Sequence, residues 1–145
     1  MIDIKLKKIS PLAKIPAKMS THAAGYDLYS SNEDQIILKK NQIKMIPTGI
    51  SVSIPPGFEA QIRPRSGLAI KHGIGILNSP GTIDADYRGE IKVILFNFGE
   101  EDFIIRTNMR IAQMIVSKHE KLKFTLVENL DDTDRGAGGF GHTKI

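Results

Sequence analysis

The sequence predicts an all-β fold that carries one short helix and ends in a flexible, glycine-rich C-terminal tail. Apolar runs recur along the chain, and turn residues separate them at intervals of about eight to twelve residues, a spacing typical of β-sandwiches and β-barrels. Only one stretch combines a helix start with a helix stop. At 145 residues, the chain is long enough to form one domain with a buried core.

The expected strands follow one another from the N-terminus. Ile2, Ile4 and Leu6 alternate with charged residues, which is the period of a half-buried strand. Pro64 ends another strand, because proline cannot donate to a sheet ladder. Further strands are expected at residues 36–38, 43–46, 49–54, 58–63, 91–97, 102–105, 109–116 and 122–126.

The predicted helix covers residues 66–72. Ser66 is its candidate N-cap, Leu68 belongs to its packing face, and Gly73 supplies the stop. Backbone N–H groups at a helix start attract anions, and Arg65 precedes this one. The stretch is therefore a candidate oxyanion or phosphate site, although an ordinary N-cap flanked by surface arginines fits the same residues.

Composition narrows the functional classes. The net charge of +4 permits an anionic ligand, but the lysines are spread along the chain, so the charge does not distinguish a nucleotide from nucleic acid. The chain has no cysteine, which excludes disulfides and cysteine-based metal sites. No stretch has the length of a transmembrane helix, and the first residues lack the apolar run of a signal peptide. We expect a soluble, cytoplasmic protein that binds no membrane.

The chemically richest stretch is residues 81–90. It opens and closes near glycines and carries Asp84 and Asp86, followed by Tyr87 and Arg88. An apolar run comes next, so the stretch predicts a β-hairpin with polar chemistry at its turn. In a regular strand the two carboxylates would point the same way, because alternate residues share a face. Taken alone, the stretch also fits a solvated turn.

A second candidate anion site lies in the tail. Glycines at positions 136, 138, 139 and 141 surround Phe140, and they allow successive backbone N–H groups to turn toward one anion. Arg135 adds a bidentate phosphate donor. A flexible tail without a ligand is the alternative, but the single aromatic side chain would then have nothing to stack on.

Two further segments place polar residues among apolar ones. Gln113 interrupts the apolar strand pattern of residues 110–115. A buried glutamine paired with backbone is the alternative to a ligand contact there. Gly25 lies two positions before Asp27, and glycine allows close backbone approach beside that carboxylate.

In order along the chain, five of these segments resemble the five motifs of the trimeric dUTP pyrophosphatase (dUTPase) family. Any one of them could arise by chance, whereas five in order are very specific. The segments are residues 24–30, 64–69, 81–89, 110–115 and 135–143.

The resemblance implies a jelly-roll-like distorted β-barrel that assembles as a homotrimer with shared active sites. Residues 1–127 would form the β domain, and residues 128–145 a glycine-rich arm that closes over an active site of a neighbouring subunit. The implied substrate is dUTP, hydrolysed to dUMP and pyrophosphate, which supplies dUMP for thymidylate synthesis and keeps uracil out of DNA. No stable nucleic-acid binding is implied.

The resemblance also implies roles for individual residues. Asp84 would deprotonate the water that attacks the α-phosphorus, with Gln113 and Ser66 as the other catalytic residues. Mg²⁺ is the implied cofactor, and Asp27 would hold it through water. The implied substrate-binding residues are Arg65, Ser66, Gly67, Asn78, Thr82, Ile83, Asp84, Tyr87, Lys92, Gln113, Arg135, Phe140 and Gly141.

Two alternatives share the same fold. A dCTP deaminase needs a proton-shuttling glutamate and a serine–arginine arrangement around the base, and no stretch here resembles that motif. A non-catalytic, dUTPase-like binding trimer would be expected to lack catalytic residues. Arg65, Asp84, Tyr87 and the complete fifth motif are present, which argues against it.

Overall fold

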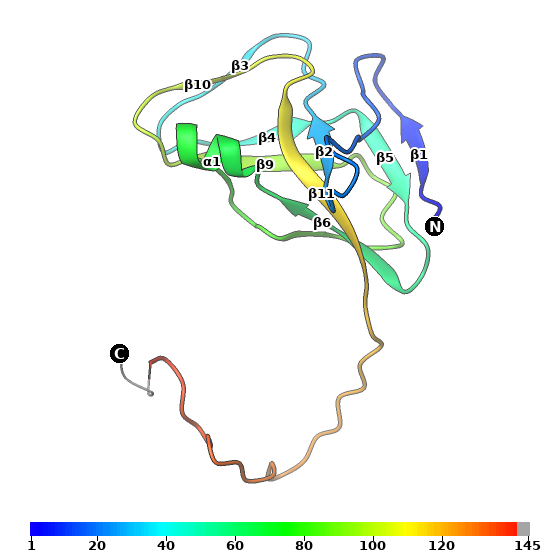
Figure 1. The fold of residues 1–145 in the computed structure, drawn as a ribbon, viewed down its shortest axis with the longest axis vertical. Helices are drawn as coiled ribbons and strands as arrows, with labels where there is room; N and C mark the ends of the chain where they lie inside the picture. Colours follow the sequence, from blue (N-terminus) through cyan, green and yellow to red (C-terminus); the bar gives the residue numbers. More distant parts are fainter. Residues whose placement is uncertain (142–145) are drawn as a thin grey trace.

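The computed structural model describes residues 1–141, and β-strands dominate it (Figure 1). This content confirms the predicted all-β class with one short helix. The predicted fifth motif and arm run on to residues 143 and 145, so their ends lie outside the described residues. The elements are β1 (Lys5–Lys8), β2 (Tyr26–Tyr29), β3 (Ile36–Leu38), β4 (Ile43–Pro47), β5 (Ile50–Ser53), β6 (Phe58–Arg63), α1 (Ser66–His72), β7 (Ile74–Ile76), β8 (Gly81–Ile83), β9 (Lys92–Asn97), β10 (Phe103–Ile105) and β11 (Arg110–Lys118).

Antiparallel pairing distributes the strands over four sheets. The largest has the order β2-β11-β6-β8 and the next has the order β4-β9-β7, while β1 pairs with β5 and β10 pairs with β3. Strand β11, with nine residues, pairs along both edges and joins β2 to β6. Across residues 1–141 the four sheets stay separate in their pairing, so the strands form no closed barrel.

Side chains from all four sheets meet in one hydrophobic core. Alternate residues of β5 and β9 are buried, including Ile50, Val52, Val93 and Leu95, as the two-residue period of a strand requires. Full burial of such a side chain contributes about 1.5–3 kcal/mol. The core therefore provides a stable frame on which exposed loops and strand ends can carry chemistry.

Helix α1 has the predicted bounds but not the predicted cap. Arg65 occupies the N-cap position in an extended conformation, and no side chain caps the helix. Ser66 is already the first helical residue, so its expected capping role is wrong. Gly73 ends the helix as expected, with φ of 64° and its N–H bonded to the carbonyl of Ala69 at 3.0 Å. Within residues 1–141, no helix is long and apolar enough to cross a membrane.

The predicted hairpin around residues 81–90 is wrong. Strand β8 pairs with β6, whereas β9 pairs with β4 and β7, so the two strands belong to different sheets. The residues between them do turn, since the N–H of Tyr87 donates to the carbonyl of Asp84 at 3.1 Å. Local sequence identifies the turn, but the partner of each strand depends on segments far away in the chain.

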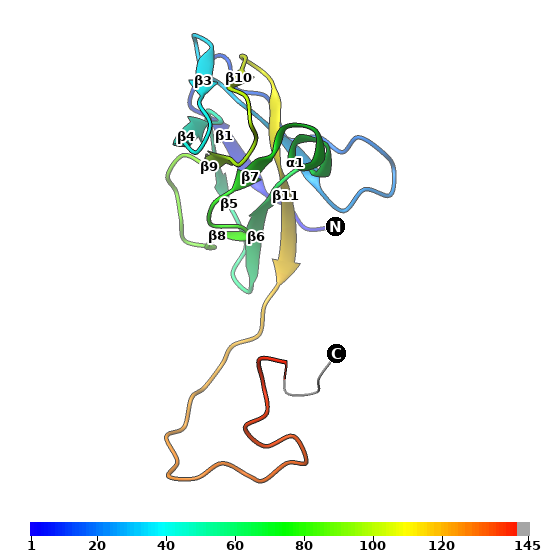
Figure 2. The same cartoon turned by 90° about the vertical axis from the view of Figure 1, so that its left-hand side faces the viewer.

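Beyond β11 the chain leaves the β domain. Residues 119–141, called the tail below, contain no helix or strand, and both Figures 1 and 2 show the tail extending away from the sheets. The strand expected at residues 122–126 is therefore wrong for a single chain. Its alternating side chains, Leu122, Phe124 and Leu126, are exposed, and the segment pairs with no described strand.

Candidate active site

A cluster of charged side chains lies where β2, β11 and the start of α1 meet. Asp27 of β2 is buried, and its Oδ2 lies 3.1 Å from Nη1 of Arg110. Its Oδ1 lies 3.5 Å from Nε of Arg65, and Nη1 of Arg65 donates to the carbonyl oxygen of Arg110 at 3.1 Å. This Asp27 cluster (Asp27, Arg65 and Arg110) has one carboxylate for two guanidinium groups. Its excess positive charge favours an anionic ligand.

Gln113 borders the cluster and ties β11 to the segment before α1. It pairs with Asp27 on one side and with Arg63 on the other. Its Nε2 donates to the carbonyl of Pro64 at 3.0 Å. This bond fixes the chain immediately before Arg65, so Gln113 supports the cluster even without a ligand.

The first two residues of α1 are open beside this cluster. Ser66 and Gly67 are exposed, and a Cβ atom built at Gly67 would meet no other atom within 4 Å. The Arg65 guanidinium and the Ser66 hydroxyl are therefore close in sequence and accessible to a ligand. Both groups donate hydrogen bonds of the kind that phosphate oxygens accept.

A cavity of about 420 Å³ lies between β8 and β9. A regular hairpin would close this space with ladder hydrogen bonds, but these two strands pair with other partners. Five predicted site residues therefore meet in one cavity. Its lining residues are Met45, Thr82, Ile83, Asp84, Tyr87, Glu90, Lys92 and Ile94.

The Tyr87 ring is held at the wall of this cavity. Its hydroxyl donates to the carbonyl of Glu90 at 2.9 Å, and a Cβ built at Gly89 would lie only 2.5 Å from Cζ of the ring. Glu90 is itself anchored, because its Oε1 accepts the N–H of Gly49 at 2.9 Å and its Oε2 lies 3.5 Å from Nζ of Lys92. The ring can lie this close to the backbone only because residue 89 has no side chain.

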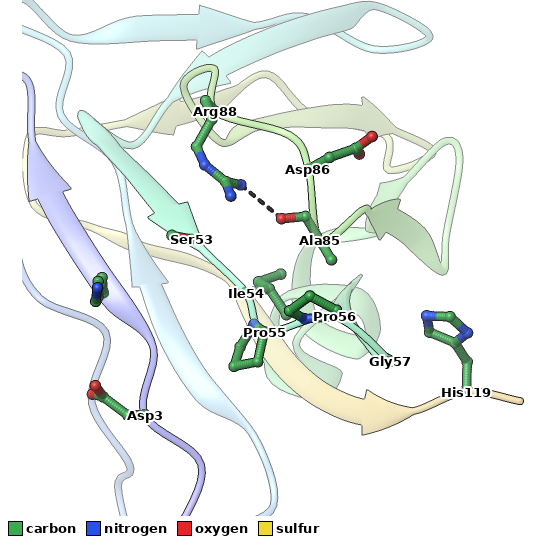
Figure 3. A pocket seen from close by; sticks show the side chains of 11 residues that line it. Asp3, Ser53, Ile54, Pro55, Pro56, Gly57, Ala85, Asp86, Arg88 and His119 are labelled. Atoms are coloured by element: carbon green, nitrogen blue, oxygen red, sulfur yellow. Dashed lines mark hydrogen bonds between the residues drawn. The ribbon is translucent and has the colours of Figure 1, made fainter.

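Asp84 and Asp86 line different cavities. Asp84 is exposed in the 420 Å³ cavity, whereas Asp86 and Arg88 line a second cavity of about 590 Å³ (Figure 3). In that view the Arg88 guanidinium donates to the carbonyl of Ala85 at 2.6 Å. The stretch is a turn and not a strand, so the two carboxylates do not share a face.

The remaining predicted residues lie outside both groups. Asn78 is exposed and does not line the 420 Å³ cavity, but its Nδ2 would lie 3.0 Å from a Cβ built at Gly81, the first residue of β8. In the tail, Arg135 Nε donates to the carbonyl of Gly138 at 2.8 Å. Phe140 is fully exposed, and Gly141 is exposed with φ of 86°. A single chain therefore does not bring the tail residues to the cavity or the cluster.

The cavity and the Asp27 cluster are also separate from each other. No residue that lines the cavity belongs to the cluster. Ile83 pairs with Ala60 of β6, whereas Arg63, next to the cluster, lies further along the same strand. At the rise per residue of a β-strand, the distance along β6 from Ala60 to Arg63 is about 10 Å. Asp84 and Arg65 therefore lie toward opposite ends of β6.

Comparisons with known proteins match this arrangement to one family. The dUTPase family model matches residues 12–144. The chain belongs to the dUTPase family. Similar dUTPases include the deoxyuridine 5'-triphosphate nucleotidohydrolase of Rickettsia typhi, 55% identical over 146 residues that cover 100% of this chain and 99% of the relative. The enzyme of the same name from Rickettsia felis is 54% identical, with 99% and 97% covered.

Solved dUTPase structures have the same fold. The dUTPase of Staphylococcus bacteriophage 80alpha with dUPNHPP has a TM-score of 0.89 at 24% identity and covers 99% of both chains. A mutant dUTPase from phage phi11 of S. aureus has a TM-score of 0.80 at 21% identity. That comparison covers 90% of this chain and 99% of the phage chain. The structure of that mutant is named for the coordination of a structural Mg(II) ion.

Sequence reasoning missed several residues around this dUTPase-family site. Arg110 contacts Asp27; it opens the segment that resembles the fourth motif, but the prediction selected only Gln113 from that segment. Gly89 and Glu90 fix Tyr87. A glycine two positions after an aromatic residue was the available signal. Gly25 lies against Gln113, and nothing in the sequence links these two distant positions.

Proposed function

We propose that this chain hydrolyses dUTP to dUMP and pyrophosphate through attack of water on the α-phosphorus. The observation that carries the proposal is the cavity between β8 and β9, where Asp84 and Tyr87 lie beside residues of both strands. The full-length likeness to two Rickettsia enzymes named for dUTP hydrolysis supports the same activity. The reaction supplies dUMP for thymidylate synthesis and keeps uracil out of DNA.

The cavity binds the uracil base through its two strands. Backbone groups of Thr82, Ile83 and Lys92 read the edge of the base, and Asn78 contributes from beside the start of β8. The walls of the cavity would exclude the methyl group of thymine. This assignment is supported by the cavity itself, which is lined by Thr82, Ile83 and Lys92.

Tyr87 selects the sugar. Its ring packs against the deoxyribose and leaves no room for a ribose 2′-hydroxyl. The hydrogen bond to the Glu90 carbonyl and the close approach to Gly89 support this role, because both keep the ring in one place. A fixed ring rejects an extra hydroxyl more strongly than a mobile ring does.

Asp84 is the general base. It accepts a proton from the attacking water while pyrophosphate departs from the α-phosphorus. Among the described residues, Glu90 is the only other carboxylate that lines the cavity. Both of its oxygens are already engaged, one by the N–H of Gly49 and the other by Lys92. Asp84 is therefore the carboxylate available for proton transfer.

The Asp27 cluster and the start of α1 bind the triphosphate. Arg65, Ser66 and Gly67 contact phosphate oxygens, with Ser66 near the bond that breaks, where charge develops. Gln113 orients the attacking water through its carboxamide oxygen, which accepts, or the α-phosphate through the second N–H of Nε2. The first N–H of Nε2 donates to the carbonyl of Pro64, and this bond holds the carboxamide in place.

The tail completes the site. Arg135 contacts the γ-phosphate, backbone N–H groups up to Gly141 contact phosphate oxygens, and Phe140 stacks on the uracil. The exposure of Phe140 supports this role, because a large aromatic side chain otherwise remains in water. Closure of a tail over the nucleotide excludes water and holds the triphosphate in line for attack.

The Asp27 cluster fits Mg²⁺ that binds together with the substrate. Within residues 1–141, no three Asp, Glu or His side chains gather at one point, so the described chain offers no all-protein cage. Mg²⁺ is commonly held by one or two carboxylates, substrate phosphates and several waters, and Asp27 supplies one carboxylate beside the phosphate-binding residues. Asp27 would hold the ion through water. When bound, Mg²⁺ neutralises charge on the phosphate oxygens.

Each complete site is shared between subunits of a homotrimer. The cavity of one chain, with Asp84, faces the Asp27 cluster of a second chain, and a third chain donates the tail. The offset of about 10 Å along β6 between these two groups supports the sharing. The detached position of the tail supports it as well (Figure 1).

The test is nucleotide turnover measured side by side. Pyrophosphate release from dUTP, dCTP and UTP is followed with Mg²⁺ and again with excess EDTA. We expect rapid release from dUTP alone, and loss of that release in EDTA. Ammonia production from dCTP would instead indicate a deaminase, and tight binding of dUTP without turnover would indicate a non-catalytic binding protein.

A further inference from the structure

Strand β11 begins with an irregularity. From Ala112 onward it pairs with β2 in one continuous register, but Arg110 pairs with Tyr29, so Ile111 is an extra residue on β11. This is a β-bulge, which shifts the side chains that precede it to the other face of the strand.

The bulge decides which side chain lies beside Asp27. Ile111 and Ala112 are consecutive and both buried, so the regular alternation is broken at this point. In an unbroken strand the residue on the Gln113 face would be Ile111, which could not pair with a carboxylate. The bulge puts Arg110 on that face, with Nη1 3.1 Å from Oδ2 of Asp27.

Arg110 supports Arg65 through two contacts. Both guanidinium groups share the carboxylate of Asp27, Arg110 at Oδ2 and Arg65 at Oδ1. The carbonyl oxygen of Arg110 also accepts a hydrogen bond from Nη1 of Arg65. Asp27 is only 8% exposed, and a buried carboxylate left without a partner is strongly destabilising.

We propose that Arg110 is a positioning residue for triphosphate binding. It keeps Asp27 charge-paired, and it holds the start of β11 in place when Arg65 turns its guanidinium from Asp27 toward phosphate. Arg65 can then bind the ligand without leaving a buried charge unpaired. The inference rests on the proposed function, since the ligand concerned is the triphosphate of dUTP.

The first test compares two ligands that differ in the triphosphate. Arg110→Gln should weaken binding of dUpNHpp, the imido analogue of dUTP, by about 10- to 100-fold, the effect of one lost charge-assisted hydrogen bond. Binding of deoxyuridine, measured by competition, should be unchanged because its base and sugar bind outside the Asp27 cluster. Arg106→Gln is the matched control. Arg106 is exposed, and its side chain makes no ion pair among the described residues.

The second test asks whether Arg110 acts through Asp27. Affinity for dUpNHpp is measured for Asp27→Asn, Arg110→Gln and the double variant. In the Asp27→Asn background, Arg110→Gln should weaken dUpNHpp binding by less than about a further twofold. The effects of substitutions within one network of contacts are not additive. Fully additive losses, or an equal loss of deoxyuridine binding, would overturn the proposal.

Arg110→Lys covers the case in which Arg110→Gln does not fold. Lysine keeps the charge but lacks the guanidinium fork, so its loss of dUpNHpp affinity should be smaller than that of the glutamine variant. If circular dichroism shows that neither variant folds, Arg110 serves folding and the proposal is wrong. A wild-type chain that neither binds dUpNHpp nor hydrolyses dUTP overturns the proposed function itself. Wild-type binding together with unchanged binding by Arg110→Gln overturns this inference alone.

Discussion

Gly25 lies directly against the side chain of Gln113. A Cβ atom at position 25 would lie 3.2 Å from Cδ and 3.3 Å from Cβ of Gln113, and it would overlap Oε1. Gln113 in turn bonds the carbonyl of Pro64. The missing side chain at Gly25 therefore allows β11 to hold the segment that precedes Arg65.

Gly25→Ala should displace Gln113 and lower kcat for dUTP by about 10- to 100-fold, since a small misplacement near the reacting groups has effects of this size. The free energy of unfolding should fall by about 1–3 kcal/mol from overpacking. Steady-state kinetics and urea unfolding measure the two effects. In a Gln113→Ala background Oε1 and Cδ are gone and only the Cβ atom at 3.3 Å remains, so the same substitution should cost much less stability. An equal loss of stability in both backgrounds would contradict the contact.

Asp84→Asn should lower kcat by about 10²–10⁴-fold, the usual effect of losing a general base. Affinity for dUpNHpp should stay near that of the wild type, because the amide keeps the size of the carboxylate. Asp86→Asn is the matched control, since Asp86 lines the other cavity. Near-normal turnover by the Asp84 variant would remove that residue from the mechanism.

Gly89→Ala should relax sugar selection without touching the substrate directly. The new methyl group would displace the Tyr87 ring, so the kcat/KM of UTP should rise relative to that of dUTP. Tyr87→Ala should raise it further, by up to about 10²-fold, the limit of rejection of an added hydroxyl by a pocket. Tyr87→Phe keeps the ring beside Gly89 but loses the bond to Glu90, so it should raise the ratio less than Tyr87→Ala does. An unchanged ratio in Tyr87→Ala would mean that another group rejects the 2′-hydroxyl.

Deletion of residues 134–145 should leave a folded protein with little dUTPase activity. The described part of this segment buries almost none of its side chains, so its removal should not change the urea midpoint. Pyrophosphate release should fall sharply because the nucleotide is no longer covered. A large loss of stability would show instead that the tail belongs to the folded core.

Mixing two inactive proteins tests whether sites are shared. Chains that lack residues 134–145 are combined with full-length chains carrying Asp84→Asn under conditions of subunit exchange. Some mixed sites then combine an intact Asp84 with an intact tail, and activity should return. If labelled subunits exchange and no activity appears, the tail acts within its own chain.

Local patterns predicted most elements because they depend on near neighbours. The expected helix at 66–72 is α1, and the expected strand at 58–63 is β6. Strand pairing was not predictable in this way. The turn after β8 suggested a hairpin, yet Ile83 pairs with Ala60 and Lys92 pairs with Pro47. Those contacts depend on segments far apart in the sequence.

The site was predictable only in part for the same reason. The segment around Asp84 and Tyr87 is continuous, so its residues could be chosen from the motif it resembles, and the structure places them in one cavity. Arg110 lies in the segment that resembles the fourth motif, but its contact with Asp27 was not predictable, because its side chain faces Asp27 only through the bulge at Ile111. A regular two-residue strand period would have put Ile111, and not Arg110, on the face beside Asp27.

The offset along β6 between the cavity and the Asp27 cluster has a consequence for enzyme amount. If no single chain carries a whole site, the turnover measured per chain depends on protein concentration. Dilution below the dissociation constant of the assembly should reduce specific activity even while single chains keep their secondary structure. Near that concentration, a fall in the amount of protein would reduce dUTP removal more than proportionally.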